Sequence, residues 1–265
     1  VGEDSHGTMM AGLLVANGKF YGAAPGVDLS VALALGPSGT SGQEDRVAQA
    51  IRWCRITQKA DIVSLSLGSE PGDGMGIQSE TVLAVQEALD AGIFVVAAAG
   101  NTGYDTSISD VSVPANLRGV IAVGASTYGG SVWSNSANGS LLDPYSQENR
   151  SYPNQKPEVS APGVLLFSTT STQIEPPYAY STGTSDSTVL VSGALALILE
   201  LHGTALAGDD GVIDSEEMEI VKRSLASSCS KTAISGSPHD EKGGYGILDA
   251  AQWASDIAFE LNIAD

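Results

Sequence analysis

The N-terminal half of the chain alternates between short apolar runs and longer segments with apolar residues at helical spacing. Residues 27–35 form a strand-like apolar run, which leads through a turn-rich stretch into residues 44–60. In that second segment apolar positions recur about once per helical turn. A short β-branched run follows at residues 61–68 and ends at a glycine. The pattern therefore predicts a strand, a helix and a second strand in that order.

The same alternation continues through the middle of the chain. Residues 79–92 predict a helix that Ser79 caps at its start and Gly92 ends. The continuous apolar run at residues 93–101 is typical of a strand buried on both faces, and residues 119–126 predict a further strand. Strands that alternate with helices indicate an α/β fold, with a doubly wound, mostly parallel central sheet flanked by helices on both faces.

Two more helices are predicted late in the chain, over residues 185–201 and 215–225. Asp214 and Glu217 have the spacing of a capping box at the start of the second helix. Residues 208–217 also resemble half of a calcium loop, but the first two ligand positions of such a loop would lack ligating side chains. The helix cap is therefore the better interpretation. The sequence contains no internal repeat or low-complexity linker, so we expect one domain.

Composition and charge exclude some kinds of binding partner. Acidic residues outnumber basic ones 31 to 12, which gives a net charge of −19. A polyanion would be repelled, so no nucleic-acid partner is expected. No uninterrupted apolar stretch reaches the roughly 18 residues of a spanning helix, so no membrane span is expected. The two cysteines lack the spacing of metal ligands.

Three residues at the ends of predicted elements point to acyl-transfer chemistry. Ser185 precedes a long apolar helix, His6 opens another apolar helical run, and Asn101 ends a buried strand. A serine hydroxyl needs a base to become a nucleophile, and histidine is the usual base near neutral pH. An asparagine amide can hold the oxyanion of the transition state. Each residue alone has a structural explanation, as a turn or a cap. Together they supply a base, an oxyanion donor and a nucleophile.

The sequence around these residues resembles a known family. "DSHGTMMAG" is similar to the histidine motif of the subtilisin-like serine proteases, the subtilases, and "VVAAAGN" is similar to the strand that ends at their oxyanion asparagine. "VSLSLGS" looks like their substrate-pairing edge strand. Further matches follow in family order: "YGAAPGVDL", "VPANLRGVIAVGAS", "KPEVSAPG", "TGTSDST" and "GYGILDAA". The resemblance covers essentially the whole chain.

The resemblance implies a role for each of the three residues. His6 would be the general base and then the general acid, and Ser185 would form the acyl-enzyme. The Ser185 backbone N–H and the Asn101 amide would hold the oxyanion, helped by the helix dipole. The Val113–Pro114 peptide bond aligns with one that is often cis in the family, so we predict cis here.

The resemblance also implies which residues hold substrate. Two segments would clamp the peptide as an added β-strand, and the specificity pocket would lie beside the strand that ends at Asn101. The residues concerned are Gly39, Thr40, Ser41, Gly42, Ser66, Leu67, Gly68, Ala99 and Gly100, with Ser112 near the pocket floor. The implied function is that of a serine endopeptidase acting on a peptide or protein substrate.

One member of the family's catalytic triad has no counterpart in the chain. The family carries an aspartate in an Asp-Thr/Ser-Gly motif on its first strand, and no such motif precedes His6. Residues 1–265 would then form a single, N-terminally incomplete catalytic domain that lacks its first strand. An N-terminal segment or a second chain would supply the aspartate. The alternatives are a degenerate, non-catalytic relative, or substitution by another acid such as Asp186.

Asp186 is itself a departure, since the family usually has an apolar residue after the nucleophile. A charge there would stabilise a protonated His6 and oppose the oxyanion. No cofactor is required by the implied chemistry, and structural calcium stays open. The acidic composition and the family imply an extracellular or cell-surface location. A catalytically silent or self-processing module with a structural or interaction role is the alternative function.

Overall fold

The computed structural model describes most of the chain. The described residues are 5–36, 44–71, 79–173, 175–230 and 238–263. The substrate-clamp residues predicted at 39–42 lie outside this part.

A parallel sheet forms the centre of the molecule. Its strands lie side by side in the order β1 (Ile62–Leu65), β2 (Phe94–Ala98), β3 (Ile121–Ser126) and β4 (Val159–Pro162). Every residue of β2 and β3 is buried, as expected for strands covered on both faces.

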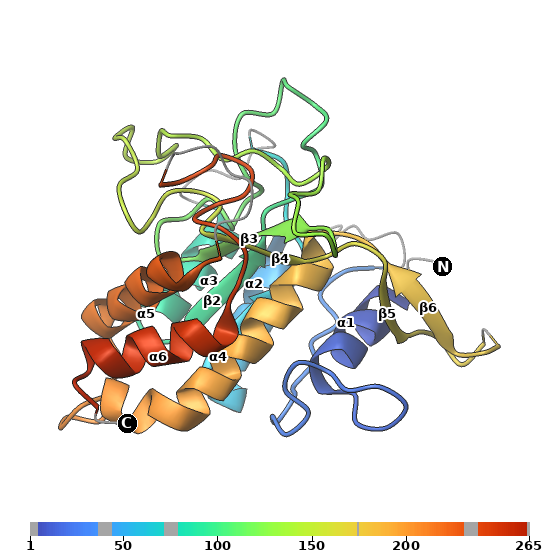
Figure 1. Cartoon of the computed structure of the whole chain (residues 1–265), viewed down its shortest axis with the longest axis horizontal. Helices are drawn as coiled ribbons and strands as arrows, with labels where there is room; N and C mark the ends of the chain where they lie inside the picture. Colours follow the sequence, from blue (N-terminus) through green and yellow to red (C-terminus); the bar gives the residue numbers. More distant parts are fainter. Residues whose placement is uncertain (1–4, 37–43, 72–78, 174, 231–237, 264–265) are drawn as a thin grey trace.

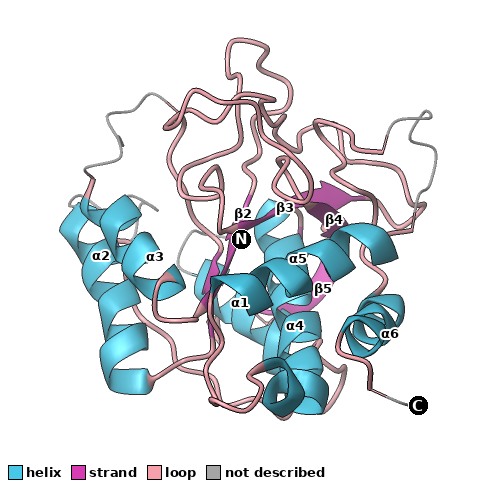
Figure 2. Cartoon of the chain, turned by 90° about the vertical axis from the view of Figure 1, so that its left-hand side faces the viewer, coloured by secondary structure: helices cyan, strands magenta, loops and turns pink. Residues whose placement is uncertain are grey.

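Helices cover both faces of this sheet. Figure 2 shows α2 (Glu44–Trp53) and α3 (Glu80–Leu89) on one side, with α5 (Ser215–Ser228) and α6 (Ala250–Glu260) on the other. The long helix α4 (Thr184–Leu206) packs directly against all four strands. This arrangement, seen from another side in Figure 1, confirms the predicted doubly wound α/β fold.

Helix α4 is long and apolar enough to cross a membrane by length and composition. Its contacts identify it as a core helix, since it packs against the sheet, α1 (His6–Val15) and α6. Val191 and Leu195 are fully buried in the main core. A helix buried in a protein core can be as long and as apolar as a helix that spans a membrane.

The predicted helix ends are largely confirmed. Ser79 caps α3, since its hydroxyl accepts a hydrogen bond from the N–H of Val82. Asp214 and Glu217 form the expected capping box at α5. Helix α2 continues into a π-helical turn, η2 (Cys54–Gln58), and the chain then turns at Lys59, which adopts a positive φ of 52°.

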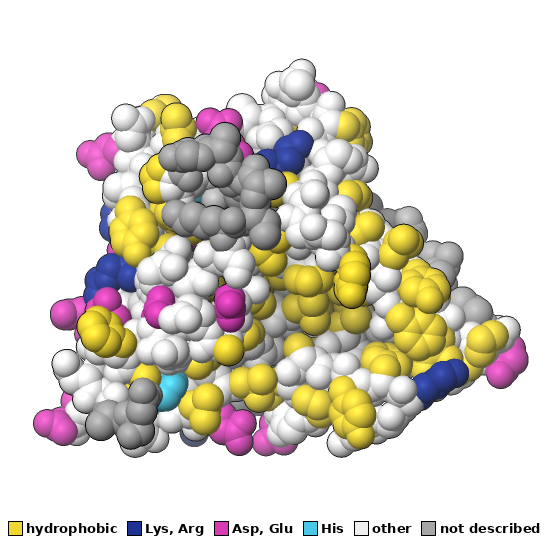
Figure 3. Space-filling view, in the orientation of Figure 1, with side chains coloured by type: hydrophobic (Ala, Val, Ile, Leu, Met, Phe, Trp, Pro, Cys, Tyr) yellow, Lys and Arg dark blue, Asp and Glu magenta, His cyan; other side chains and the backbone are white. Residues whose placement is uncertain are grey.

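A smaller unit packs beside the main body. Helix α1 lies against an antiparallel hairpin made of β5 (Leu166–Thr169) and β6 (Tyr178–Ser181). The approach is close at Gly12, where a Cβ atom would lie 2.3 Å from Thr169 Oγ1. Figure 3 shows hydrophobic side chains gathered over the hairpin, on the right of the view.

The strand predicted at residues 27–35 does not form, and that part of the prediction is wrong. The chain is extended there, but residues 28–36 make no backbone–backbone hydrogen bond to any described residue. A β-strand exists only when a neighbouring strand pairs with it. The apolar pattern of this segment is therefore present without a pairing strand in the part of the chain that the structure describes.

Candidate active site

Ser185 lies in the first turn of α4, close to the carboxyl end of β1. Its side chain is half-buried, and its Oγ donates to the backbone oxygen of Ser66 at 3.3 Å. The Ser66 hydroxyl donates in return to the backbone oxygen of Ser185 at 3.0 Å. These reciprocal bonds fix the start of α4 against the end of the edge strand.

Asn101 lies beside the same helix start. Its Oδ1 accepts from both the backbone N–H and the hydroxyl of Thr184, each at 3.0 Å. The Thr184 hydroxyl in turn accepts from the N–H of Gly100 at 3.2 Å. Because the carbonyl end of the Asn101 amide is held in this way, its two N–H donors stay available.

A second donor comes from the helix itself. The first N–H groups of an α-helix have no partner within the helix. The Thr184 N–H is bound to Asn101, and the Asp186 N–H reaches the Gly183 oxygen at 3.2 Å. Among the described residues the N–H of Ser185 has no hydrogen-bond acceptor, so it is free to bind an anion. The helix dipole favours negative charge at this place.

The residues predicted to form a specificity pocket lie close to one another. Ser112 lies between Gly68 and Gly100, where a Cβ atom on either glycine would lie within 3 Å of the serine side chain. Gly100 also has a positive φ of 109°. The backbones of Ser69 and Val113 exchange two hydrogen bonds and hold the segments together. Small residues are therefore required here by close packing.

Other predicted residues of this region are placed as follows. Ala99 is fully buried, and its backbone oxygen accepts from the N–H of Ser112 at 2.7 Å. Leu67 is half-buried beside the exposed Gly68 at the end of the edge strand. The peptide bond between Val113 and Pro114 is cis, as predicted.

His6 is the first residue of α1 and is exposed at the surface. Partial desolvation by the surrounding protein still lowers the pKa of its imidazole, so the ring is neutral at pH 7 and able to accept a proton. No carboxylate among the described residues acts on this pKa. No hydrogen bond joins the described His6 ring to Ser185, whose hydroxyl bonds to Ser66 instead.

Asp186 does not face solvent beside the nucleophile. Its side chain is buried, with one oxygen accepting from the Ser181 hydroxyl at 3.0 Å. The other oxygen has no hydrogen-bond partner among the described residues. Burial raises the pKa of this carboxyl to about 6. The sequence analysis did not single out Thr184, which bonds to Asn101, or Ser181, which bonds to Asp186, although both lie in the stretch around the nucleophile.

No group of three or more His, Cys, Asp or Glu side chains suited to a metal ion occurs in the described part of the chain. Structural calcium stays a prediction.

The sequence matches the model of the subtilase family over residues 1–246. The chain belongs to the subtilase family. Subtilisin E of Bacillus subtilis (strain 168) is 36% identical over 203 residues, which cover 76% of this subtilase and 47% of the relative. This subtilase thus spans about half the length of the curated relatives it matches.

Solved structures agree on the fold of this subtilase. The self-cleaved protease domain of PatA has a TM-score of 0.71 at 22% identity, covering 96% of this chain and 83% of that one. The prenylagaramide maturation protease PagA has a TM-score of 0.67 at 22% identity, covering 95% and 82% of the two chains.

Proposed function

We propose that this subtilase is a serine endopeptidase that cleaves extended peptide segments through an acyl-enzyme on Ser185. The observation that carries the proposal is the pair of free donors beside the Ser185 hydroxyl. One is the Asn101 amide, oriented by Thr184, and the other is the Ser185 N–H at the start of α4. Two donors next to a nucleophilic hydroxyl are the components of an oxyanion hole.

The proposed reaction moves one proton at a time. Ser185 Oγ attacks the peptide carbonyl carbon while its proton passes to the neutral imidazole of His6. The two donors hold the oxyanion, and His6 then gives the proton to the leaving amine as the C–N bond breaks. Water repeats the sequence on the ester, which releases the acid and restores Ser185.

A carboxylate has to orient His6 for this reaction, because nothing among the described residues does so. We propose that it is supplied by a segment outside the 265 residues, either N-terminal in the same polypeptide or on a second chain. Loss of the triad aspartate costs about 10⁴-fold in kcat in the well-studied case, so the chain alone would turn over slowly.

Substrate would lie along the free end of the edge strand. Ser66–Gly68 follow β1 directly and have small or half-buried side chains. An extended peptide can pair with this backbone, with residues 39–42 proposed as the opposite clamp. The pocket around Ser112 would receive the side chain before the scissile bond.

A self-processing or catalytically silent module is the alternative. The observation that favours it is the His6 ring, which lacks both a carboxylate partner and a hydrogen bond to Ser185 in the described structure. One structural relative is described as a self-cleaved protease domain. A module that acts once on its own chain needs little turnover.

A fluorophosphonate probe separates these functions. We expect it to label wild-type chain at Ser185 and to leave Ser185→Ala unlabelled, while Ser146→Ala, which removes an exposed hydroxyl, labels normally. Asn101→Ala should reduce the labelling rate about 10²–10³-fold, as loss of one oxyanion donor does. Absence of labelling, with or without an added triad segment, would favour the silent module.

A further inference from the structure

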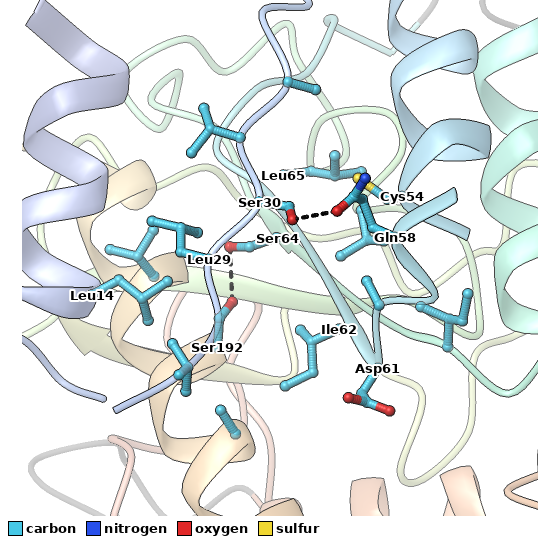
Figure 4. A pocket seen from close by; sticks show the side chains of 18 of the residues that line it. Leu14, Leu29, Ser30, Cys54, Gln58, Asp61, Ile62, Ser64, Leu65 and Ser192 are labelled. Carbon is cyan, nitrogen blue, oxygen red and sulfur yellow. Dashed lines mark hydrogen bonds between the residues drawn. The ribbon is translucent and has the colours of Figure 1, made fainter. Parts of the chain in front are cut away.

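The nucleophile side of the candidate site is held by contacts between α4 and β1. Figure 4 shows the Ser192 hydroxyl of α4, which donates to the Ser64 hydroxyl of β1 at 2.8 Å. About two turns earlier along α4, Ser185 and Ser66 exchange their two hydrogen bonds. Two pairs of side-chain contacts therefore fix the start of α4 against the strand.

The oxyanion side of the site lies outside the sheet. β2 ends at Ala98, and Asn101 is an exposed residue of the turn that follows, residues 100–103, which we call the oxyanion turn. This turn leads directly into residues 104–109, most of which are exposed. Thr184 holds the side chain of Asn101, but it does not hold the backbone beyond it. The position of the turn therefore depends on contacts with other parts of the chain.

A second loop, residues 134–137, lies against the oxyanion turn, and we call it the support loop. The N–H of Ala137 donates to the backbone oxygen of Gly100 at 2.9 Å, and the N–H of Gly103 donates to the backbone oxygen of Asn135 at 2.9 Å. The support loop is itself fixed to the sheet, because the hydroxyl of its third residue accepts from a backbone N–H of β3 at 3.1 Å. The oxyanion turn thus rests on a loop that the sheet holds in place.

The ammonium group of Lys242 joins these two loops beyond their last backbone bond. Its Nζ donates to the backbone oxygen of Gly103 at 3.0 Å and to that of Ser134 at 2.8 Å. One side chain therefore binds the end of the oxyanion turn and the start of the support loop together. Lys242 and Gly103 are 139 residues apart in the sequence, so no local pattern predicts this contact.

The backbone of Lys242 is held in a tight turn. Asp240 and Gly244 exchange two backbone hydrogen bonds of 2.9 and 2.8 Å, and the Asp240 carboxylate accepts from the N–H of Lys242 at 3.0 Å. The turn is joined to β4, where the hydroxyl of Ser160 donates to the backbone oxygen of Gly243 at 3.1 Å. The lysine side chain therefore extends from a fixed base to the two loops.

The ammonium of Lys242 binds backbone oxygens and no acid. Among the described residues no carboxylate pairs with it, whereas the buried cations Arg150 and Lys156 pair with Asp110 and Glu158. An ammonium has three N–H donors, and two of them are used here, one for each loop. Hydrogen bonds from a charged donor are stronger than those between neutral groups. The half-buried cation is therefore suited to joining two backbones.

We propose that Lys242 is a positioning residue of the active site, whose ammonium joins the oxyanion turn to the support loop and thereby places the Asn101 amide beside Ser185. The catalytic consequence rests on the proposed function, in which Asn101 holds the oxyanion. The joining of the loops does not rest on it. Without Lys242 the end of the turn loses a strong donor and can shift, and the amide then meets the developing charge in a poorer geometry.

A double-mutant cycle tests this role in the chain together with the segment proposed to supply the triad aspartate. Lys242→Met should slow fluorophosphonate labelling of Ser185 about tenfold, less than the loss of about 10²–10³-fold on removing the Asn101 donor itself. On a peptide substrate the loss should appear in kcat, with KM changed by no more than about twofold. In an Asn101→Ala background the same substitution should have almost no effect, because the group that Lys242 positions is absent.

Hydrogen exchange followed by mass spectrometry gives a readout that needs no activity. Lys242→Met should speed amide exchange in residues 100–104 and 134–138, where the two loops meet, while residues 93–98 of the buried strand region stay protected. The matched control is Lys59→Met, which removes the same charge from an exposed lysine. It should leave both the labelling rate and the exchange of the two loops unchanged.

Two results would overturn the proposal. One is an equal loss of labelling rate from Lys242→Met with and without Asn101, because the lysine would then act by another route. The other is unchanged exchange in residues 100–104. If wild-type chain is not labelled at Ser185 while Lys242→Met still speeds exchange in the two loops, the contact made by Lys242 is supported and the proposed catalytic function fails.

Discussion

At the residue scale, Asp186 and Ser185 are neighbours with different environments. Ser185 is half-buried and its hydroxyl is held only by a 3.3 Å bond, so it can be reached by a substrate. Asp186 is 1% exposed, and only one of its oxygens is hydrogen-bonded among the described residues. With a pKa of about 6 the neutral acid predominates only below pH 6, so the charge expected to oppose the oxyanion is largely absent in mildly acidic solution.

Replacing Asp186 by asparagine should change how stability depends on pH. The folded-state pKa of Asp186, about 6, lies above the usual 3.8. The contribution of this side chain to folding stability is therefore full below pH 4 and is lost as pH rises through 6. We expect Asp186→Asn to match wild type near pH 4 and to be more stable by at most about 3 kcal/mol above pH 7. Urea unfolding at several pH values measures this difference.

The matched control is Asp209→Asn, which removes an exposed carboxylate far along the chain. A plot of its free energy of unfolding against pH should run parallel to the plot for the wild type. If the Asp186→Asn curve is also parallel, the carboxyl is charged in the fold and the burial argument is wrong.

At the scale of elements, a buried ionic cluster ties the sheet to α5. Glu158 Oε1 lies 2.9 Å from Lys156 Nζ and 2.7 Å from Lys222 Nζ, and all three side chains are almost fully buried. The other oxygen of Glu158 accepts from the N–H of Ala122 at 2.8 Å. Burial lowers the pKa of Lys156 to about 7, which shows how strongly its desolvation opposes the attraction of the carboxylate.

Glu158→Gln should therefore be strongly destabilising. It leaves the buried amino groups of Lys156 and Lys222 without their counter-charge, a loss of about 3–5 kcal/mol at neutral pH. Glu87→Gln is the surface counterpart, since Glu87 also pairs with two cations, Arg52 and Arg55, but remains partly exposed. That change should cost no more than about 1 kcal/mol per pair. Equal losses in thermal or urea unfolding would show that burial does not set the difference.

At the scale of the whole molecule, the net charge of −19 should steer substrates. A strongly negative surface attracts cationic peptides and repels anionic ones over about a Debye length. This effect acts on association, and it is separate from the fit of side chains in the pocket around Ser112.

We expect matched peptides that differ only in distal Lys or Glu residues to differ about tenfold or more in kcat/KM at low ionic strength. Salt at about 0.5 M should slow cleavage of the Lys peptide, speed that of the Glu peptide and bring the two rates together. The measurement uses the chain together with the segment proposed to supply the triad aspartate. A ratio that salt leaves unchanged would place the preference in direct contacts instead.

The sequence by itself determined the elements that depend on local chemistry. The capping box at α5 and the Ser79 cap follow from hydrogen bonds within a few residues. Strand β2 and helix α4 follow from apolar runs whose length and period fit buried elements. The motif around Asn101 and Ser185 also predicts the proposed anion site, because each residue lies directly at the end of such an element.

Only the tertiary structure decided what depends on partners distant in sequence. Residues 28–35 have the pattern of a strand, but pairing needs a neighbour that none of the described residues provides. Likewise, the burial of Asp186 depends on which groups from other elements surround it. The same holds for His6, on which no carboxylate among the described residues acts. A local pattern sets the preference of a segment, whereas hydrogen-bond pairing, desolvation and charge compensation are properties of the neighbours that folding brings to it.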